Sequence, residues 1–404
     1  MCKIIAMKIN LPKLSPIKLP PRRGLFVGLG LVLAFSASIL SYQTYTLYQK
    51  TSKLEGEKQN AISQLESIKT EIETLKNTDQ VKRNEELKGE IANIQKTYDT
   101  AVGVYEDLVK LQESTDKTDE LEKLFAQALS LLSKRNYQEA SSTLTTLSGK
   151  IQDEQNKIAT SFSIPENVPT NNAPPGSGYS RQQVSSDAGT FMVSVVAADT
   201  GSTQVIVDTA SSGTCTNDCP VLPLATYVSR NGAYAGVNGS YFCPASYPSC
   251  VGKTNSFDLL LMNKDKTYFN SDNNVYSNNP GVIFGGGYIR FVSAVSQWGR
   301  DTGIDSMLSN YPLLISGGNV VFGGDDDPKK GSKGNRSFVA NKGNSVYIGV
   351  VHSATVAESA RVLKALGMEN ALNLDDGGST ALWSGGYKVG PGRDLPNVIL
   401  FVSK

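Results

Sequence analysis

The sequence contains almost no histidine. His352 is the single histidine among 404 residues, so a Ser-His-Asp triad or a histidine-rich metal site would depend entirely on that side chain. We therefore expect neither mechanism, and we expect no metal and no cofactor. We interpret His352, at the end of a predicted strand, as a hydrogen-bonded structural residue.

The sequence also lacks an excess of charge of either sign. Lys and Arg number 39, Asp and Glu number 38, and the formal net charge is +1. Proteins that bind nucleic acid normally carry a concentrated basic face, so we expect no nucleic-acid partner. At about 150 residues per domain, the length predicts more than one unit.

Charge is missing altogether from residues 24–49, whereas residues 1–23 contain only basic charges. About 20 apolar residues span a bilayer as a helix, and positive charge before a span predicts a cytoplasmic amino terminus. We predict a basic cytoplasmic segment over 1–23 and a transmembrane helix over 24–45. The chain would then be a single-pass protein of the cell membrane with its C-terminal domain extracytoplasmic. A cleaved signal peptide is the alternative, because Ser36-Ala37-Ser38 resembles a small-residue cleavage site.

After this span, apolar residues recur every three or four positions, in two runs. The runs are Ala61, Leu65, Ile68, Ile72 and Leu75, then Leu87, Ile91, Ile94, Tyr98, Ala101, Tyr105 and Leu108. This spacing is typical of a coiled-coil seam. Antiparallel pairing within one chain and parallel pairing between two chains both satisfy it, and we favour a homo-oligomer.

Two further helical stripes follow, and they predict a helical hairpin. Their members are Leu121, Leu124, Ala128 and Leu131, then Ala140, Leu144, Leu147 and Ile151. We assign coiled coil and hairpin to residues 46–161. Proline and glycine among polar residues over 162–178 indicate a linker, so the last domain would cover 179–404.

Short strand-like runs replace helices in this last domain. They cover 191–197, 204–207, 234–237, 259–262, 282–284, 288–292, 345–351 and 398–402. We predict an α+β fold around a mixed, largely antiparallel sheet, with a hairpin turn at Gly285-Gly286-Gly287. One helix is expected over 355–367, where apolar residues have helical spacing and Gly367 suits a C-cap.

Four cysteines lie close together in this domain: Cys215, Cys219, Cys243 and Cys250. An exported context favours disulfides, and the spacing is not a standard zinc arrangement. We predict two disulfides, whose pairing remains open among three connectivities.

The strongest candidate for a reaction centre is the stretch Ala371–Trp383. A short buried strand is expected over 371–374, and Asp375-Asp376-Gly377-Gly378 then brings two carboxylates into a turn where glycine allows close approach of a ligand. Asp-Gly and Gly-Gly are also ordinary turn formers, so this stretch does not decide the function alone.

Five motifs in order resemble the phosphodiester glycosidase family. They are Gly236-Val-Asn-Gly-Ser-Tyr-Phe242, Tyr311-Pro-Leu-Leu-Ile-Ser-Gly317, Asn335-Arg-Ser-Phe-Val-Ala340, the stretch around Asp375, and Arg393-Asp-Leu-Pro-Asn-Val398. Two departures stand out: Asp376 replaces a glycine of the family pattern, and Ser240-Tyr241 replaces glycine-phenylalanine. The resemblance implies the same α+β fold.

The resemblance also implies roles for individual residues. Asp375 would act as nucleophile or as base for an attacking water, with Asp376 assisting it or capping the turn. Arg336 and Arg393 would present planar donors to phosphate oxygens. The remaining substrate-binding candidates are Asn238, Gly239, Gly317, Asn373, Gly377, Gly378 and Ser379.

These observations predict a membrane-anchored extracytoplasmic hydrolase that cleaves the glycosidic bond of sugar 1-phosphodiesters in cell-envelope or surface glycans. Its partners would be this phosphosugar or surface-polymer substrate and the membrane. The alternative is a surface protein that binds or scaffolds phosphosugar polymers without cleaving them.

Overall fold

The computed structural model describes residues 22–76 and 78–404. The chain divides into two units, one ending at Ile91 and the other beginning at Ala92. The first contains helix α1 (Arg22–Lys76) and the start of α2 (Asp79–Gln112). Most of the predicted basic segment, residues 1–21, lies outside the described residues.

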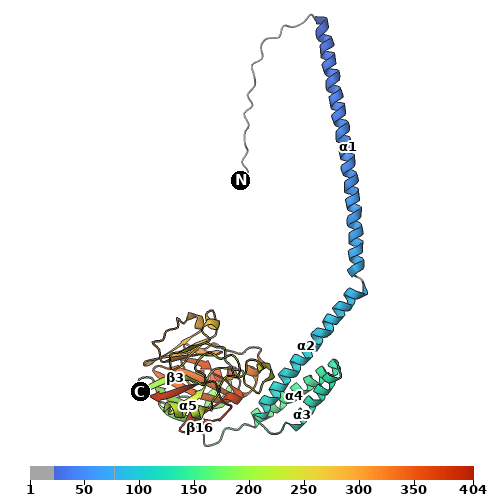
Figure 1. Ribbon diagram of the computed structural model, residues 1–404. Coiled ribbons are helices and arrows are strands. Elements are labelled where there is room, and N and C mark those ends of the chain that lie inside the picture. The colour runs from blue at the N-terminus through green and yellow to red at the C-terminus, as the bar shows by residue number, and fades with distance from the viewer. Residues whose placement is uncertain (1–21, 77) are drawn as a thin grey trace. The chain divides into compact units, whose positions relative to one another are not determined.

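Helix α1 covers the predicted transmembrane span (Figure 1). Among residues 22–76 and 78–404, however, no helix is both long enough and apolar enough to cross a membrane. The transmembrane helix predicted over 24–45 is thus not found among these residues.

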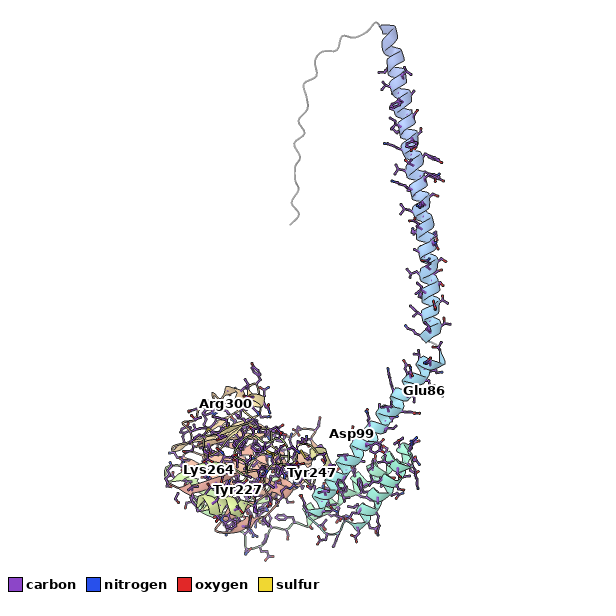
Figure 2. All side chains as sticks on the ribbon, in the orientation of Figure 1. Glu86, Asp99, Tyr227, Tyr247, Lys264 and Arg300 are labelled. Atoms are coloured by element: carbon purple, nitrogen blue, oxygen red, sulfur yellow. A yellow bond between two sulfur atoms is a disulfide. The ribbon has the colours of Figure 1, made fainter. Side chains whose placement is uncertain are left out.

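The predicted coiled coil is not observed within the described chain. Side chains of α1 project from a single helix (Figure 2), and Leu65 and Ile68 are 68% and 55% exposed. The later part of the apolar repeat is buried within the chain instead of pairing with another long helix. Its residues Ala101 and Leu108 pack in a bundle with two other helices. A homo-oligomer formed through the α1 seam stays a prediction.

That bundle joins the end of α2 to α3 (Asp119–Ser133) and α4 (Tyr137–Ser161), which form a hairpin (Figure 1). Its buried side chains are Ala101, Val104, Leu108, Leu111, Leu121, Ala128, Leu132, Ala140, Leu144, Leu147 and Ile151. Asn136 caps α4 by accepting a hydrogen bond from the Glu139 N–H at 3.3 Å. The bundle thus has its own apolar core.

The rest of the second unit contains three sheets, whose strand pairs are all antiparallel among the described residues. The first has the order β1 (Gly178–Ser186), β2 (Gly189–Asp199), β13 (Ser345–Ala354), β12 (Gly334–Lys342), β14 (Asn370–Asn373), β10 (Leu313–Ser316), β11 (Asn319–Val320). The second has the order β16 (Tyr387–Val389), β15 (Leu382–Ser384), β4 (Ala235–Asn238), β17 (Asn397–Ser403), β3 (Thr203–Thr209). The third has the order β6 (Tyr268–Phe269), β5 (Leu261–Met262), β9 (Ser306–Ser309), β7 (Gly281–Gly285), β8 (Tyr288–Val292).

Short helical elements complete this part of the chain. They are α5 (Leu224–Asn231), α6 (Pro328–Gly331), α7 (Val356–Ala365) and the 3-10 turns η1 (Pro248–Cys250), η2 (Asp272–Asn274), η3 (Val295–Gln297) and η4 (Gly377–Ser379). The α+β prediction is confirmed, but the sheets are antiparallel rather than mixed. The hairpin between β7 and β8 turns at the predicted glycines.

One apolar core is shared by all three sheets. Val350 and Leu372 of the first sheet, Val237 of the second, and Val282 and Leu308 of the third lie in the same buried cluster. The opposite face of the first sheet packs on α7 through a second cluster. The central strands are therefore buried on both faces, which explains their nearly continuous apolar sequences.

Helix α7 forms where its sequence predicts. Thr355 and Glu358 form a reciprocal capping box at its start, and Gly367 adopts a left-handed φ of +75° just after its end. The chain then enters β14, which Asp375 follows two residues after its end.

Both predicted disulfides are present. Cys215 bonds to Cys219, and Cys243 bonds to Cys250. The structure thus selects local pairing from the three connectivities. Residues of the predicted linker lie along β1, where the Asn171 N–H donates to the Gln183 carbonyl at 2.9 Å.

The bundle core yields a test of stability. Leu144 of α4 is fully buried, whereas Leu129 of α3 is 46% exposed. We expect Leu144→Ala to lower the free energy of unfolding by about 2–5 kcal/mol, because it removes buried apolar surface and leaves a cavity. Thermal unfolding followed by circular dichroism at 222 nm would measure this change. The matched control Leu129→Ala should have a much smaller effect, and equal effects would contradict the packing described here.

Candidate active site

The turn that carries Asp375 and Asp376 connects two sheets. It follows β14 of the first sheet, and the Leu374 N–H donates to the Ser337 carbonyl of β12 at 3.0 Å. The Asp375 N–H donates to the Gly239 carbonyl, just after β4 of the second sheet, at 2.9 Å. The two carboxylates are therefore placed by backbone hydrogen bonds to strands from both sheets.

Asn238 strengthens the same junction from inside. Its side chain is fully buried, donates from Nδ2 to the Asp375 carbonyl at 2.6 Å, and accepts on Oδ1 from the Ser337 hydroxyl at 2.8 Å and the Ala381 N–H at 3.1 Å. A Cβ at the next position, Gly239, would collide with Asn397. Asn238 and Gly239 thus help to hold the Asp375 turn in place.

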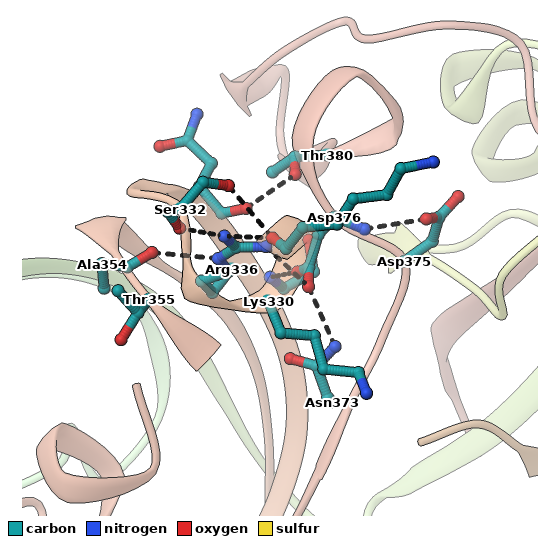
Figure 3. A network of polar contacts seen from close by, with 12 residues as sticks. Lys330, Ser332, Arg336, Ala354, Thr355, Asn373, Asp375, Asp376 and Thr380 are labelled. Carbon is teal, nitrogen blue, oxygen red and sulfur yellow. Dashed lines mark hydrogen bonds and ion pairs between the residues drawn. The ribbon is translucent and has the colours of Figure 1, made fainter. Parts of the chain in front are cut away.

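The Asp376 carboxylate lies at the centre of a polar network (Figure 3). Its side chain is 8% exposed. Oδ1 accepts from the Ser337 N–H at 3.0 Å. Oδ2 accepts from Arg336 Nη1 at 3.2 Å, Asn373 Nδ2 at 2.9 Å and the Tyr241 hydroxyl at 3.3 Å. Burial raises the pKa of Asp376, and the positive charge of Arg336 opposes that rise.

Arg336 lies at the cavity beside the carboxylates, but most of its donors are engaged within the protein. Its side chain is 3% exposed; Nε donates to the Ala354 carbonyl at 2.9 Å, and Nη2 donates to the carbonyls of Lys329 and Ser332. With Nη1 bonded to Asp376, few donors remain for a ligand. The geometry favours Arg336 as the counter-charge of Asp376.

Asp375 is the less bonded of the two carboxylates. Burial, with Asp376 beside it, raises the pKa of Asp375 to about 7, although hydrogen bonds from Ser379 and the Asp376 N–H and the positive charge of Arg393 act in the opposite direction. A carboxylate with this pKa exchanges protons near neutral pH. This property distinguishes Asp375 as the candidate for acid–base chemistry.

Arg393 lies on the glycine side of the turn. Its guanidinium pairs with Glu113 of the helical bundle and lies over the Tyr247 ring at 5.5 Å; Tyr247 is labelled in Figure 2. A Cβ at Gly378 would collide with both Arg393 and Glu113. Gly377 has a left-handed φ of +61°, a conformation that favours glycine, and a side chain at Gly378 would displace the ends of Arg393 and Glu113.

A cavity of about 290 Å³ opens onto both carboxylates. Its lining includes Asp375, Asp376, Tyr241, Arg393 and Lys110 of α2. A neighbouring cavity of about 800 Å³ shares Lys110, Gly378 and Arg393 with it. The candidate site is therefore a concave, strongly charged pocket.

Not every predicted residue reaches this pocket. Gly317 lies in the turn between β10 and β11, where its N–H donates to Asn370 Oδ1 at 3.1 Å, at the start of β14 rather than its end. Asn373 is fully buried and uses its Nδ2 within the Asp376 network.

His352, interpreted from the sequence as a structural residue, lies in β13. Its Nε2 is 3.0 Å from the Ser194 hydroxyl, and burial lowers its pKa to about 4.

Sequence reasoning missed several residues of the site. Ser337 and Asn397 lie inside the motifs noted above but carry no chemical signal of their own. Tyr241 was identified only as a departure from the family pattern. Lys110 and Glu113 belong to a helix far from the motifs in sequence, and no local signal connects them to the pocket.

The comparison with known families bears on this geometry. Residues 231–402 match the sequence profile of the phosphodiester glycosidases. This segment matches the phosphodiester glycosidase family. The predicted resemblance is confirmed, and the family is one of hydrolases. Lys110 and Glu113 lie outside the matched segment. Among curated proteins, none is significantly similar in sequence to the chain.

Solved structures provide weaker likenesses. One is the catalytic domain of zebrafish N-acetylglucosamine-1-phosphodiester alpha-N-acetylglucosaminidase, auto-inhibited by its pro-peptide, with 14% identity, a TM-score of 0.42, and coverage of 59% of this chain and 87% of that one. Another is a hypothetical protein from Synechocystis, with 14% identity, a TM-score of 0.41, and coverage of 56% of this chain and 62% of that one. The alignment thus spans less than two thirds of the Synechocystis protein.

The raised pKa of Asp375 predicts how stability depends on pH. The native pKa of about 7 exceeds the ordinary value of 3.8, so between these values the folded state binds more protons and stability falls as pH rises. Asp375→Asn does not lose stability in this way. At pH 8 we therefore expect its free energy of unfolding to exceed that of wild type by up to about 4 kcal/mol, and its unfolding temperature to be higher.

Thermal unfolding at pH 4 and pH 8 measures this difference. At pH 4 the two proteins should unfold at similar temperatures, because Asp375 is then protonated and uncharged. Asp187→Asn, which changes an exposed residue, is the control. A variant that is less stable than wild type at pH 8 would contradict the assignment.

Proposed function

We propose that this protein hydrolyses the bond between the anomeric carbon of a sugar and the phosphate of a sugar 1-phosphodiester, within a cell-envelope or surface glycan. The observation that carries the proposal is Asp375, a buried carboxylate with a pKa near 7 that lines a cavity beside Arg393. The match of residues 231–402 to the phosphodiester glycosidases supports it.

In the proposed reaction, the Asp375 carboxylate takes a proton from a water molecule. The water oxygen forms a bond to the anomeric carbon, and the bond from that carbon to the phosphate oxygen breaks. The electron pair leaves with the phosphate, which is a weak base and needs little protonation. The transition state is oxocarbenium-like, so a carboxylate next to the ring also stabilises its positive charge.

Asp376 has a supporting part in this proposal. Its two oxygens accept four hydrogen bonds, which leaves little capacity for a reacting group. Burial raises the pKa of Asp375, and the negative charge of Asp376 adds to that rise. Asp376 thus contributes to keeping Asp375 available for proton transfer near neutral pH, while Arg336 balances the charge of Asp376.

A second candidate function is binding without turnover. Two observations favour it: Asp376 and Tyr241 stand where the family pattern has glycine and phenylalanine, and the Tyr241 hydroxyl is within 3.3 Å of Asp376 Oδ2. These polar side chains occupy room next to Asp375. A protein with this pocket and no turnover would be a receptor for phosphosugar polymers.

Hydrolysis of a panel of methyl sugar 1-phosphodiesters by the full-length protein tests the proposal. We expect Asp375→Asn to lower kcat by about 10²- to 10⁴-fold, because it removes the general base. The exposed control Asp187→Asn should retain wild-type turnover. Since the base acts in its deprotonated form, kcat/KM should rise with pH through about 7 and then level off.

Two outcomes would contradict the assignment. Undiminished turnover in Asp375→Asn would exclude Asp375 as the base. Binding of the phosphodiesters by wild type without cleavage would favour the receptor function.

We also propose that the protein acts outside the cytoplasm, attached to the cell membrane by its N-terminal segment. Two disulfides support an oxidising compartment. The uncharged stretch 24–49 after a basic segment supports attachment.

Fractionation of cells tests the attachment. The full-length protein should remain with membranes after a carbonate wash, and a form lacking residues 1–49 should be released, because it lacks the apolar stretch. A full-length protein that is released by the wash would contradict membrane attachment.

A further inference from the structure

The last turns of α2 and the residue just after its end carry three charged residues that face the strand-rich part of the chain. Glu106, Lys110 and Glu113 are spaced four and three residues apart, so they lie on the same side of the helix. The face formed by Ala101, Val104, Leu108 and Leu111 packs into the bundle. The charged residues therefore occupy a separate face, which covers the pocket.

The two glutamates fix this face on either side of Lys110. Glu106 is buried, accepts from the Ser249 N–H at 3.1 Å and lies 3.7 Å from Lys329 Nζ. Glu113, one turn beyond Lys110, pairs with Arg393. Lys110 is thereby held over the cavity that contains Asp375 and Asp376.

Lys110 differs from the other cations that line this cavity. Arg336 pairs with Asp376 and Arg393 with Glu113; Lys329 pairs with Glu106, and Lys330 with Asp325. Within residues 22–76 and 78–404, no carboxylate lies within ion-pair distance of the Lys110 ammonium. Lys110 is thus the lining cation whose charge is not matched by a close carboxylate.

The surroundings of Lys110 disfavour its charge. Burial, together with the positive charge of Arg336, lowers the pKa of Lys110. Its Cε lies 3.3 Å from the position of a Cβ at Gly377, so the side chain reaches the turn that carries the carboxylates. An anion entering the cavity would stabilise the ammonium form.

We propose that Lys110 binds the phosphate group of the substrate, so that the helical bundle supplies part of the active site. This inference rests on the proposed function and extends it to a residue outside the matched family segment. The ligand class is a phosphodiester anion, held between Lys110 and Arg393. Lys110 also offsets the repulsion between that anion and the carboxylates of Asp375 and Asp376.

The experiment compares charged and uncharged substrates in the full-length protein. Wild type, Lys110→Met and Lys110→Arg are assayed with a methyl sugar 1-phosphodiester and with the uncharged 4-nitrophenyl glycoside of the same sugar. We expect Lys110→Met to raise KM for the phosphodiester about 10- to 100-fold, because a charge-assisted contact is lost, with little change in kcat. Its kinetics with the uncharged glycoside should stay within about 3-fold of wild type, which is the scatter we allow for an indirect effect.

Lys96→Met is the matched control, because Lys96 is an exposed lysine of the same helix. It should leave both activities unchanged, and Lys110→Arg should restore most of the affinity for the phosphodiester. Equal losses on both substrates would show a merely structural role and overturn the inference. Wild-type KM for the phosphodiester in Lys110→Met would overturn it as well.

Binding measurements separate this inference from the proposed function. If wild type cleaves neither substrate, the proposed hydrolysis fails, and titration calorimetry with the methyl sugar 1-phosphodiester then tests Lys110. Weaker binding by Lys110→Met than by wild type and Lys96→Met would support Lys110 as the phosphate ligand. Equal binding, or no binding by wild type, would overturn it.

Discussion

A buried carboxylate needs hydrogen-bond donors around it, and this requirement organises the candidate site. The Asp376 side chain receives donors from Arg336 and Ser337 of β12, from Asn373 of β14 and from Tyr241 after β4. These residues come from two sheets, so the sheets must meet at this turn for the charge to be satisfied. An unpaired charge at the same depth would cost several kcal/mol.

The position of Asp375 follows from this arrangement. Asp376 and Arg336 form the buried ion pair, whereas Asp375 lies outside that pair, and burial raises its pKa to about 7. The helical bundle closes the other side of the pocket through Glu113 on Arg393 and through Lys110. The helical bundle and the sheets have separate apolar cores, and both contribute charged side chains to a single cavity.

Local sequence patterns predicted the features that depend on near neighbours. The capping box and Gly367 bound α7, the glycines between β7 and β8 form the hairpin, and the spacing of leucines in α3 and α4 follows their packing. The coiled-coil prediction was wrong for the described chain, because the two apolar runs have different surroundings. Ala101 and Leu108 pack within the bundle, while Leu65 and Ile68 stay exposed in the chain.

By itself, the sequence determined the α+β class, the disulfide-forming cysteines and the turn that carries Asp375 and Asp376 after a buried strand, because these depend on composition, short-range spacing and motifs. The tertiary structure decided which charges face one another. It paired Arg336 with Asp376, placed Gly317 at the opposite end of β14, and brought Lys110 to the cavity that the two carboxylates line. Electrostatic partners are set by distance in space, and separation along the chain does not reveal that distance.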